Sequence, residues 1–169
     1  KHLRKKLMER DVIHCDKTPV QVLKEEGKKP QTKSYMWLYR SGNDCKSPIV
    51  LYDYQPSRNG DHAVAYLKEF KGYVHSDGYS GYNKLKNITR AGCWAHLRRK
   101  FVEAITTKKT VGPPTKAEIG RQYCDKLFAI EDSLKDLLPK DRFCKRLELE
   151  KPVLEAFWCW LDSLHTLKG

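Results

Sequence analysis

The chain has 169 residues, which suffices for one ordinary domain or for a domain with a smaller companion. Hydrophobic residues make up 40% of it, enough for a packed core, and no apolar run approaches the roughly 20 residues of a membrane span. The net charge of +12 favours a polyanionic partner such as nucleic acid over a basic protein with no special partner. The six cysteines form no C-x-x-C pair and no secretory signal is visible, which predicts reduced thiols in a cytoplasm.

The first half of the sequence predicts a region rich in strands. Residues 1–10 are basic and typical of the end of a helix, so we expect a piece of a longer protein. Runs of β-branched and aromatic residues predict three strands, over 11–16 with a continuation beyond Pro19, over 34–40, and over 48–54. The short turns between them imply antiparallel pairing.

Helices enter the pattern after these three strands. Asp61 is predicted to cap a helix that Gly72 ends, and a fourth strand follows at once. This crossover favours parallel pairing of the fourth strand with the third or with another neighbour. The expected elements are a helix over 61–70, strands over 73–76 and 88–93, and a helix from 94 to about 106.

The last third of the sequence predicts helices alone. Residues 107–114, TKKTVGPP, have the composition of a linker. Thr115 and Glu118 then form a capping box, and apolar residues follow at steps of three and four until Pro139 ends the run. A second helical segment is expected near residue 141, with a kink or a restart at Pro152. These segments predict a helical hairpin.

One motif occurs twice. The first strand ends as VIHCD and the fourth as YVHSD, so each places a His two residues before an Asp. Side chains alternate along a strand, and each His therefore shares a face with its Asp. If the two strands are neighbours, Asp16 and Asp77 lie side by side at one end of the sheet.

Two carboxylates this close repel unless they share a proton or a cation. Mg²⁺ is the natural counterion, because it prefers oxygen ligands and keeps water for a substrate. Two metals about 4 Å apart would suit cleavage of a phosphodiester. The alternative is that Asp16 and Asp77 each cap a turn at a strand end.

Four segments resemble the transposases of the insertion-sequence-66 family: CDKTPVQVL, SYMWLYRSG, PIVLYDYQPSRNGDHAVAYLKEFKGYVHSDGYSGYNKL and ITRAGCWAHLRRKFVEA. The resemblance implies a DDE-type transposase of α/β class, with a ribonuclease-H-like mixed five-stranded sheet, flanking helices and an α-helical hairpin insertion. The predicted element order agrees with that fold. The expected divisions are the end of a helix at 1–10, an incomplete catalytic core at 11–106, a linker at 107–114 and the insertion at 115–169.

The resemblance further implies that Asp16 and Asp77 are the first two catalytic acids and hold Mg²⁺ or Mn²⁺. They would serve cleavage of DNA at the element ends and attack of the freed 3′ hydroxyl on target DNA. The family's third acid is a Glu on a later helix, and Asp53, Glu103 and Glu155 do not stand in that context. We therefore expect these 169 residues alone to bind metal weakly and to be catalytically impaired.

Cations near the acids are candidates for phosphate contacts. Lys17 and Arg58 are expected at the catalytic edge, and Arg98, Arg99 and Lys100 lie together on the helix after residue 93. The alternative for the last three is a solvated helix face. The expected partners are the DNA of element ends and target, further copies of the chain and accessory transposition proteins, at a bacterial nucleoid and without a membrane.

Four further side chains are expected around the acids without contacting a metal directly. His14 and His75 are interpreted as packed residues, since Mg²⁺ prefers oxygen. Cys93 and His96 form a C-x-x-H motif, but zinc would need two more ligands. We expect Cys93 to pack and His96 to make a local hydrogen bond.

Two other functions stay open. A nuclease or resolvase of the same fold would cut without joining strands. A non-catalytic DNA-binding module would bind DNA in a salt-sensitive manner that neither Mg²⁺ nor Asp77→Ala changes.

Overall fold

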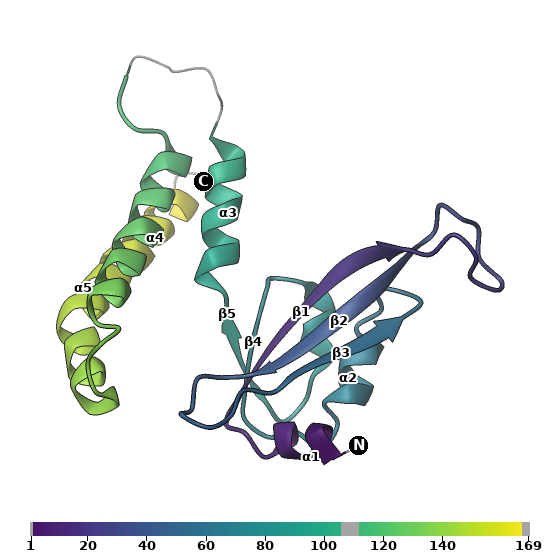
Figure 1. The fold of residues 1–169 in the computed structure, drawn as a ribbon. Helices are drawn as coiled ribbons and strands as arrows, with labels where there is room; N and C mark the ends of the chain where they lie inside the picture. The colour runs from purple at the N-terminus through teal and green to yellow at the C-terminus, as the bar shows by residue number, and fades with distance from the viewer. Residues whose placement is uncertain (1, 106–111, 167–169) are drawn as a thin grey trace. The chain divides into compact units, whose positions relative to one another are not determined.

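A computed structural model describes residues 2–105 and 112–166 (Figure 1). By internal packing the chain divides into two compact units, Lys1–Cys93 and Trp94–Gly169. The linker predicted at 107–114 falls in part on residues 107–111, which lie outside the described residues. The predicted division of the chain stays a prediction, although the helix after Cys93 packs within the second unit.

The first unit is built on a mixed five-stranded sheet in the order β3-β2-β1-β4-β5. Strand β1 pairs antiparallel with β2 and parallel with β4, while β3 extends the antiparallel side and β5 the parallel side. This sheet with its flanking helices confirms the predicted α/β class and is consistent with a ribonuclease-H-like fold. The elements are α1 (His2–Met8), β1 (Val12–Gln21), β2 (Lys33–Ser41), β3 (Val50–Gln55), α2 (Asp61–Tyr66), β4 (Tyr73–Ser76), a 3-10 helix η1 (Ser80–Lys84) and β5 (Thr89–Gly92).

Aromatic residues dominate the core of the first unit. On β2 the alternation of the strand buries Trp37 and Tyr39, and the ring of Tyr39 stacks on Tyr66 with 3.7 Å between centroids. Tyr82 of η1 meets Trp37 edge-on, so the segment after β4 is anchored in the same core. The segment that follows Asp77 is therefore held by packing and not by its backbone alone.

The structure corrects two local predictions in this unit. Strand β1 does not break at Pro19 but runs to Gln21, because β4 covers only Val12 to Cys15 and the Pro19 region is paired on one side alone. The cap of α2 is Gly60 and not Asp61, which lies in the first turn and binds Lys84.

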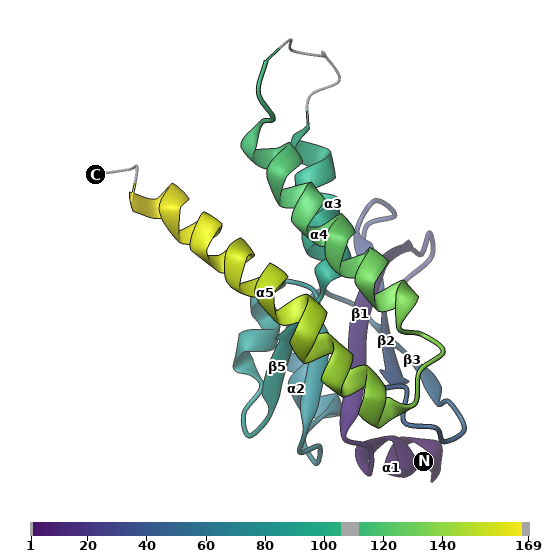
Figure 2. The ribbon, with the colours of Figure 1, turned by 90° about the vertical axis from the view of Figure 1, so that its left-hand side faces the viewer.

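The second unit consists of three helices, α3 (Trp94–Ala104), α4 (Lys116–Ser133) and α5 (Pro139–Thr166). Figure 2 shows α4 and α5 as a hairpin, as the sequence predicts. The capping box at Thr115 and Glu118 is confirmed, with both reciprocal hydrogen bonds present. Helix α4 ends at Ser133, before the predicted end, and α5 continues through Pro152 without a restart.

The core of the second unit is a ring cluster centred on buried Phe157. Tyr123, Trp94 and Trp160 each pack against it with 5.3–5.8 Å between centroids. Trp158 also contacts Phe157 but is half exposed. Across residues 2–105 and 112–166, no helix has both the length and the apolar character that crossing a membrane requires.

Candidate active site where β4 ends beside β1

Two parallel strands carry the repeated His-x-Asp motif to the same end of the sheet. The register pairs His14 with His75 and Cys15 with Ser76. Asp16 follows Cys15 within β1, and Asp77 follows Ser76 directly after β4 ends, so the two residues are neighbours on adjacent chain segments. Adjacent strands lie about 4.8 Å apart.

The two histidines meet below the acids. Their Nδ1 atoms lie 3.0 Å apart, so one ring donates a hydrogen bond and the other accepts it. Burial, followed by the charges of His75 and Arg40, lowers the pKa of His14 below its usual 6.5. His14 is therefore neutral at neutral pH, and its ring packs against His75 with 4.6 Å between centroids.

Lys17 binds the second acid. Its Nζ lies 2.8 Å from Asp77 Oδ2, and its side chain is only 3% exposed. Its backbone N–H donates to Asp16 Oδ1 at 2.7 Å, so one residue touches both acids. Since Lys17 follows Asp16 directly, alternation points its side chain to the core face, opposite Trp37 on β2.

Tyr79 and Tyr82 surround this ion pair. The Lys17 ammonium lies 4.4 Å from the centroid of the Tyr79 ring and 5.1 Å from that of Tyr82, both within range for cation–π attraction. The backbone N–H of Tyr79 donates to Asp77 Oδ1 at 3.1 Å. Asp77 is therefore held from two sides, by the ammonium on one oxygen and the amide on the other.

The loop before α2 joins the same site through Tyr79. Its hydroxyl donates to the backbone carbonyl of Arg58 at 2.5 Å, and the Arg58 guanidinium lies 4.4 Å from its ring centroid. The exposed Arg58 is thus anchored beside Asp77, where it can meet a phosphate. A close approach of Gly60 to Gly81 brings the two loops together, because a Cβ on Gly60 would lie 2.3 Å from the Gly81 carbonyl oxygen.

The two acids alter the proton affinity of groups beneath them. Burial, with a smaller contribution from Asp16, raises the pKa of the Cys15 thiol to about 12. Burial also raises the pKa of Tyr82, followed by the charges of Cys15, Asp77 and Asp16. Both groups stay protonated at neutral pH, so neither serves there as a thiolate or phenolate ligand or nucleophile.

The donor set at this end of the sheet suits a hard divalent cation, because carboxylate oxygens are its preferred ligands. Asp16 and Asp77 supply two such groups. Within 2–105 and 112–166, no cluster of three or more His, Cys, Asp or Glu side chains is placed to hold a metal. Cys93 and His96 are both half-buried, and zinc at this motif stays untested.

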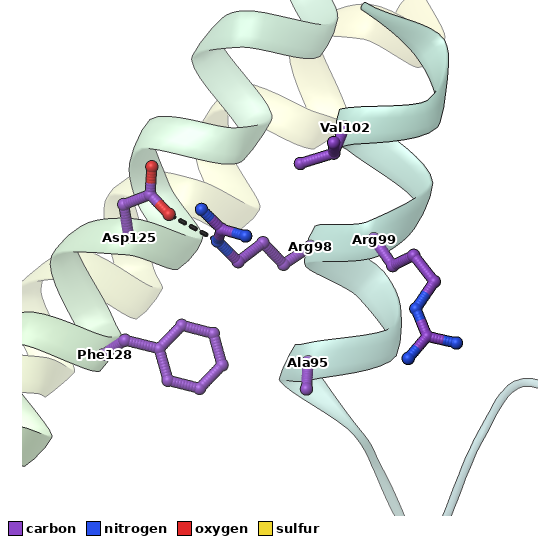
Figure 3. Close-up of a pocket in the computed structure, with 6 residues that line it drawn as sticks. All are labelled: Ala95, Arg98, Arg99, Val102, Asp125 and Phe128. Carbon is purple, nitrogen blue, oxygen red and sulfur yellow. Dashed lines mark hydrogen bonds and ion pairs between the residues drawn. The ribbon is translucent and has the colours of Figure 1, made fainter.

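The cations predicted on the helix after residue 93 lie in the second unit. Arg98 donates to Asp125 Oδ1 at 2.5 Å, and Lys100 pairs with Glu103. Figure 3 shows Arg98 reaching toward α4 while the exposed Arg99 extends on the other side of α3. An open cavity of about 590 Å³ lies between α3 and α4 and is lined by Ala95, Arg98, Arg99, Val102, Asp125 and Phe128.

Sequence reasoning missed two roles. The sequence predicts a phosphate contact for Lys17, whereas its ammonium is buried against Asp77. No motif in the sequence points to Tyr82, which borders the same ion pair. The alternation of side chains along β1 indicates that Lys17 faces the core. The segment at η1 that brings the Tyr79 and Tyr82 rings to Lys17 is placed by packing against Trp37, which local sequence does not reveal.

The comparisons with known proteins agree with the resemblance. Two relatives from Sinorhizobium fredii are proteins y4qI, 31% identical over 116 residues, and y4hP, 28% identical over 171 residues. The matches cover 60% and 89% of this chain but only 21% and 30% of the relatives, both named as uncharacterized. No solved structure matches significantly.

A model of one protein family covers nearly the whole chain. It matches residues 1–168, across both compact units. The match includes the two strands that carry Asp16 and Asp77 as well as the helical hairpin. The chain belongs to the Transposase IS66 family.

Proposed function

We propose that this chain is part of the catalytic core of a DNA transposase, which cuts phosphodiester bonds at element ends and joins the freed 3′ hydroxyl to target DNA. Membership of the family supports this coarsely. The observation that carries the proposal is the pair of acids on neighbouring parallel strands, with Asp16 inside β1 and Asp77 directly after the end of β4. Because the chain spans under a third of its relatives, the activity belongs to the longer protein.

In this proposal Asp16 and Asp77 hold Mg²⁺ or Mn²⁺, which when bound would activate the attacking oxygen and stabilise the leaving one. The protein's contribution is to hold the two carboxylates rigidly. The backbone N–H groups of Lys17 and Tyr79 each bind one acid, so neither side chain rotates freely. Rigid placement lowers the entropic cost of reaching a productive geometry.

DNA is the proposed partner, and Arg58 is the cation best placed to orient it. Its anchoring by Tyr79, whose backbone N–H binds Asp77, holds a guanidinium near this acid. Arg98, Arg99 and Lys100 are proposed as further phosphate contacts of the second unit. Several copies of the protein are proposed to act together on paired ends, with accessory proteins.

The test is DNA cleavage and strand transfer by the complete protein that contains this chain. Asp16→Asn and Asp77→Asn each should lower cleavage on the order of 10³-fold, because metal-based charge stabilisation is worth several kcal/mol. Asp61→Asn removes an acid from an exposed ion pair of the same unit and serves as the control.

Three other outcomes would overturn parts of the proposal. Cleavage that survives in both variants would remove the acids from the chemistry. Cleavage without strand transfer would indicate a nuclease or resolvase instead. Salt-sensitive DNA binding with no Mg²⁺-dependent cutting would indicate a non-catalytic binding module.

A further inference from the structure

Lys17 sits in a site built for a cation. Its ammonium contacts one carboxylate oxygen, Asp77 Oδ2, and lies near the ring centroids of Tyr79 and Tyr82. The Lys17 side chain is 3% exposed and that of Asp77 20%, so water screens their interaction less than it would at the surface. An ordinary surface lysine keeps its ammonium in water and has no such enclosure.

This ammonium places a positive charge next to the two negatively charged acids. Two carboxylates at one sheet end repel one another unless a positive charge lies near. Lys17 supplies that charge from within the chain, and it also binds Asp16 through its backbone N–H. The sheet end is thus neutralised in part before any metal arrives.

A metal and this ammonium compete for the same carboxylate. Mg²⁺ binds carboxylate oxygen at about 2.0–2.1 Å, closer than an ammonium, and carries twice its charge. Both cations on Asp77 would lie within a few ångströms of each other in a buried setting, where their repulsion is strong. This repulsion favours displacement of one cation by the other.

We infer that the Lys17 ammonium and a divalent cation are alternative occupants of the Asp77 carboxylate. The inference rests on the proposed function, since it takes Asp77 as a metal ligand. On loading, the ammonium leaves Asp77 Oδ2 and stays against the faces of Tyr79 and Tyr82, which are already within cation–π range. Lys17 is therefore a positioning residue that holds the site closed to weakly binding cations.

The first test compares Mn²⁺ affinity by calorimetry, at one fixed pH and without DNA, in the complete protein. Lys17→Met keeps most of the length of the side chain and removes its charge, and it should bind Mn²⁺ about tenfold more tightly or better. Lys84→Met is the matched control, because it removes one charge from an exposed ion pair of the same unit, and its affinity should stay unchanged. Without metal, Lys17→Met should melt at a lower temperature than the unaltered protein.

A second measurement needs no substitution at Lys17. In the unaltered protein, Mg²⁺ titration should shift the NMR signals of the Lys17 side-chain Cε and Nζ, because the ammonium changes partner. The same titration of Asp77→Asn should leave these signals in place. A Lys17 signal that does not respond to saturating Mg²⁺ in the unaltered protein would overturn the inference, even if Lys17→Met fails to fold.

The outcomes separate this inference from the proposed function. Mn²⁺ binding that is the same in Asp77→Asn as in the unaltered protein would overturn the proposed metal site, and the inference with it. Binding that requires Asp77 but is equally tight in Lys17→Met would overturn the inference alone. Tighter binding in Lys17→Met that is lost on adding Asp77→Asn supports both.

Discussion

The two units of the chain use charge in different ways. In the sheet unit, Lys17 and Asp77 form an ion pair that is largely enclosed by protein. In the helical unit, the ion pairs that Arg98, Arg121 and Arg146 form with Asp125 and Glu131 have both side chains at least 39% exposed. Exposed pairs contribute about 0–1 kcal/mol, whereas a buried charge that loses its partner is costly. Net charge alone therefore does not locate a functional site, because burial determines which charged pairs interact strongly.

The two units also differ in how they bury aromatic side chains. Trp37 and Tyr39 lie beneath a sheet and are fully buried. The helical hairpin buries Phe157 within its ring cluster but leaves Phe143 and Trp158 more than half exposed. Each unit thus has its own small core, and this makes the independence of the two units testable.

The largest expected effects come from emptying either core. Trp37→Ala and Phe157→Ala should each lower the free energy of unfolding by about 3–5 kcal/mol, because a large buried ring is replaced by a cavity. Hydrogen exchange should show the loss of protection within 2–93 for Trp37→Ala and within 94–166 for Phe157→Ala. Trp158→Ala, a truncation at a half-exposed ring of the second unit, should change stability by less than about 1 kcal/mol.

A loss of protection that spreads evenly through both units after either substitution would contradict the division. It would mean that the units unfold as one cooperative body. The comparison of Trp37 with Phe157 is therefore sharper than either variant alone, since the two differ in location but share the same kind of packing defect.

A medium effect is expected where the two loops of the sheet unit approach each other. Gly60→Ala places a Cβ against the backbone of Gly81, which cannot move as a flexible side chain would. The cost should be about 1–3 kcal/mol in urea denaturation. Gly78→Ala is the matched control in the neighbouring loop, because a Cβ there meets nothing within 4 Å, and a cost equal to that of Gly60→Ala would contradict the close approach.

The central features of the site could be predicted because they follow from local rules. The His-x-Asp motif occurs on two neighbouring strands, and alternation along each strand sets the face of every side chain. Only the pairing of β1 with β4 was left open, and the register now aligns His14 with His75. Whether Asp16 and Asp77 act as catalytic acids stays a prediction.

The features that were missed depend on residues far apart in the sequence. Asp61 has the chemistry of a helix cap, yet Lys84, 23 residues later, binds it instead. Strand β1 tolerates Pro19 because its neighbour β4 is short, which no property of β1 itself reveals. The partner of Lys17 likewise depends on where η1 packs, and single-residue preferences carry no such information.

The smallest expected effect concerns an exposed ion pair of the helical unit, and it bears directly on the comparison of charges. A double-mutant cycle of Arg98→Ala and Asp125→Ala should give a coupling below about 1 kcal/mol that falls further in high salt. The same cycle at Lys17 and Asp77, measured without metal, should give a larger coupling that salt hardly changes, because protein and not water surrounds the pair. Equal couplings with equal salt dependence would mean that burial does not make the Lys17–Asp77 pair stronger than an exposed pair. The Lys17 ammonium would then interact with Asp77 no more strongly than a surface lysine does with its partner.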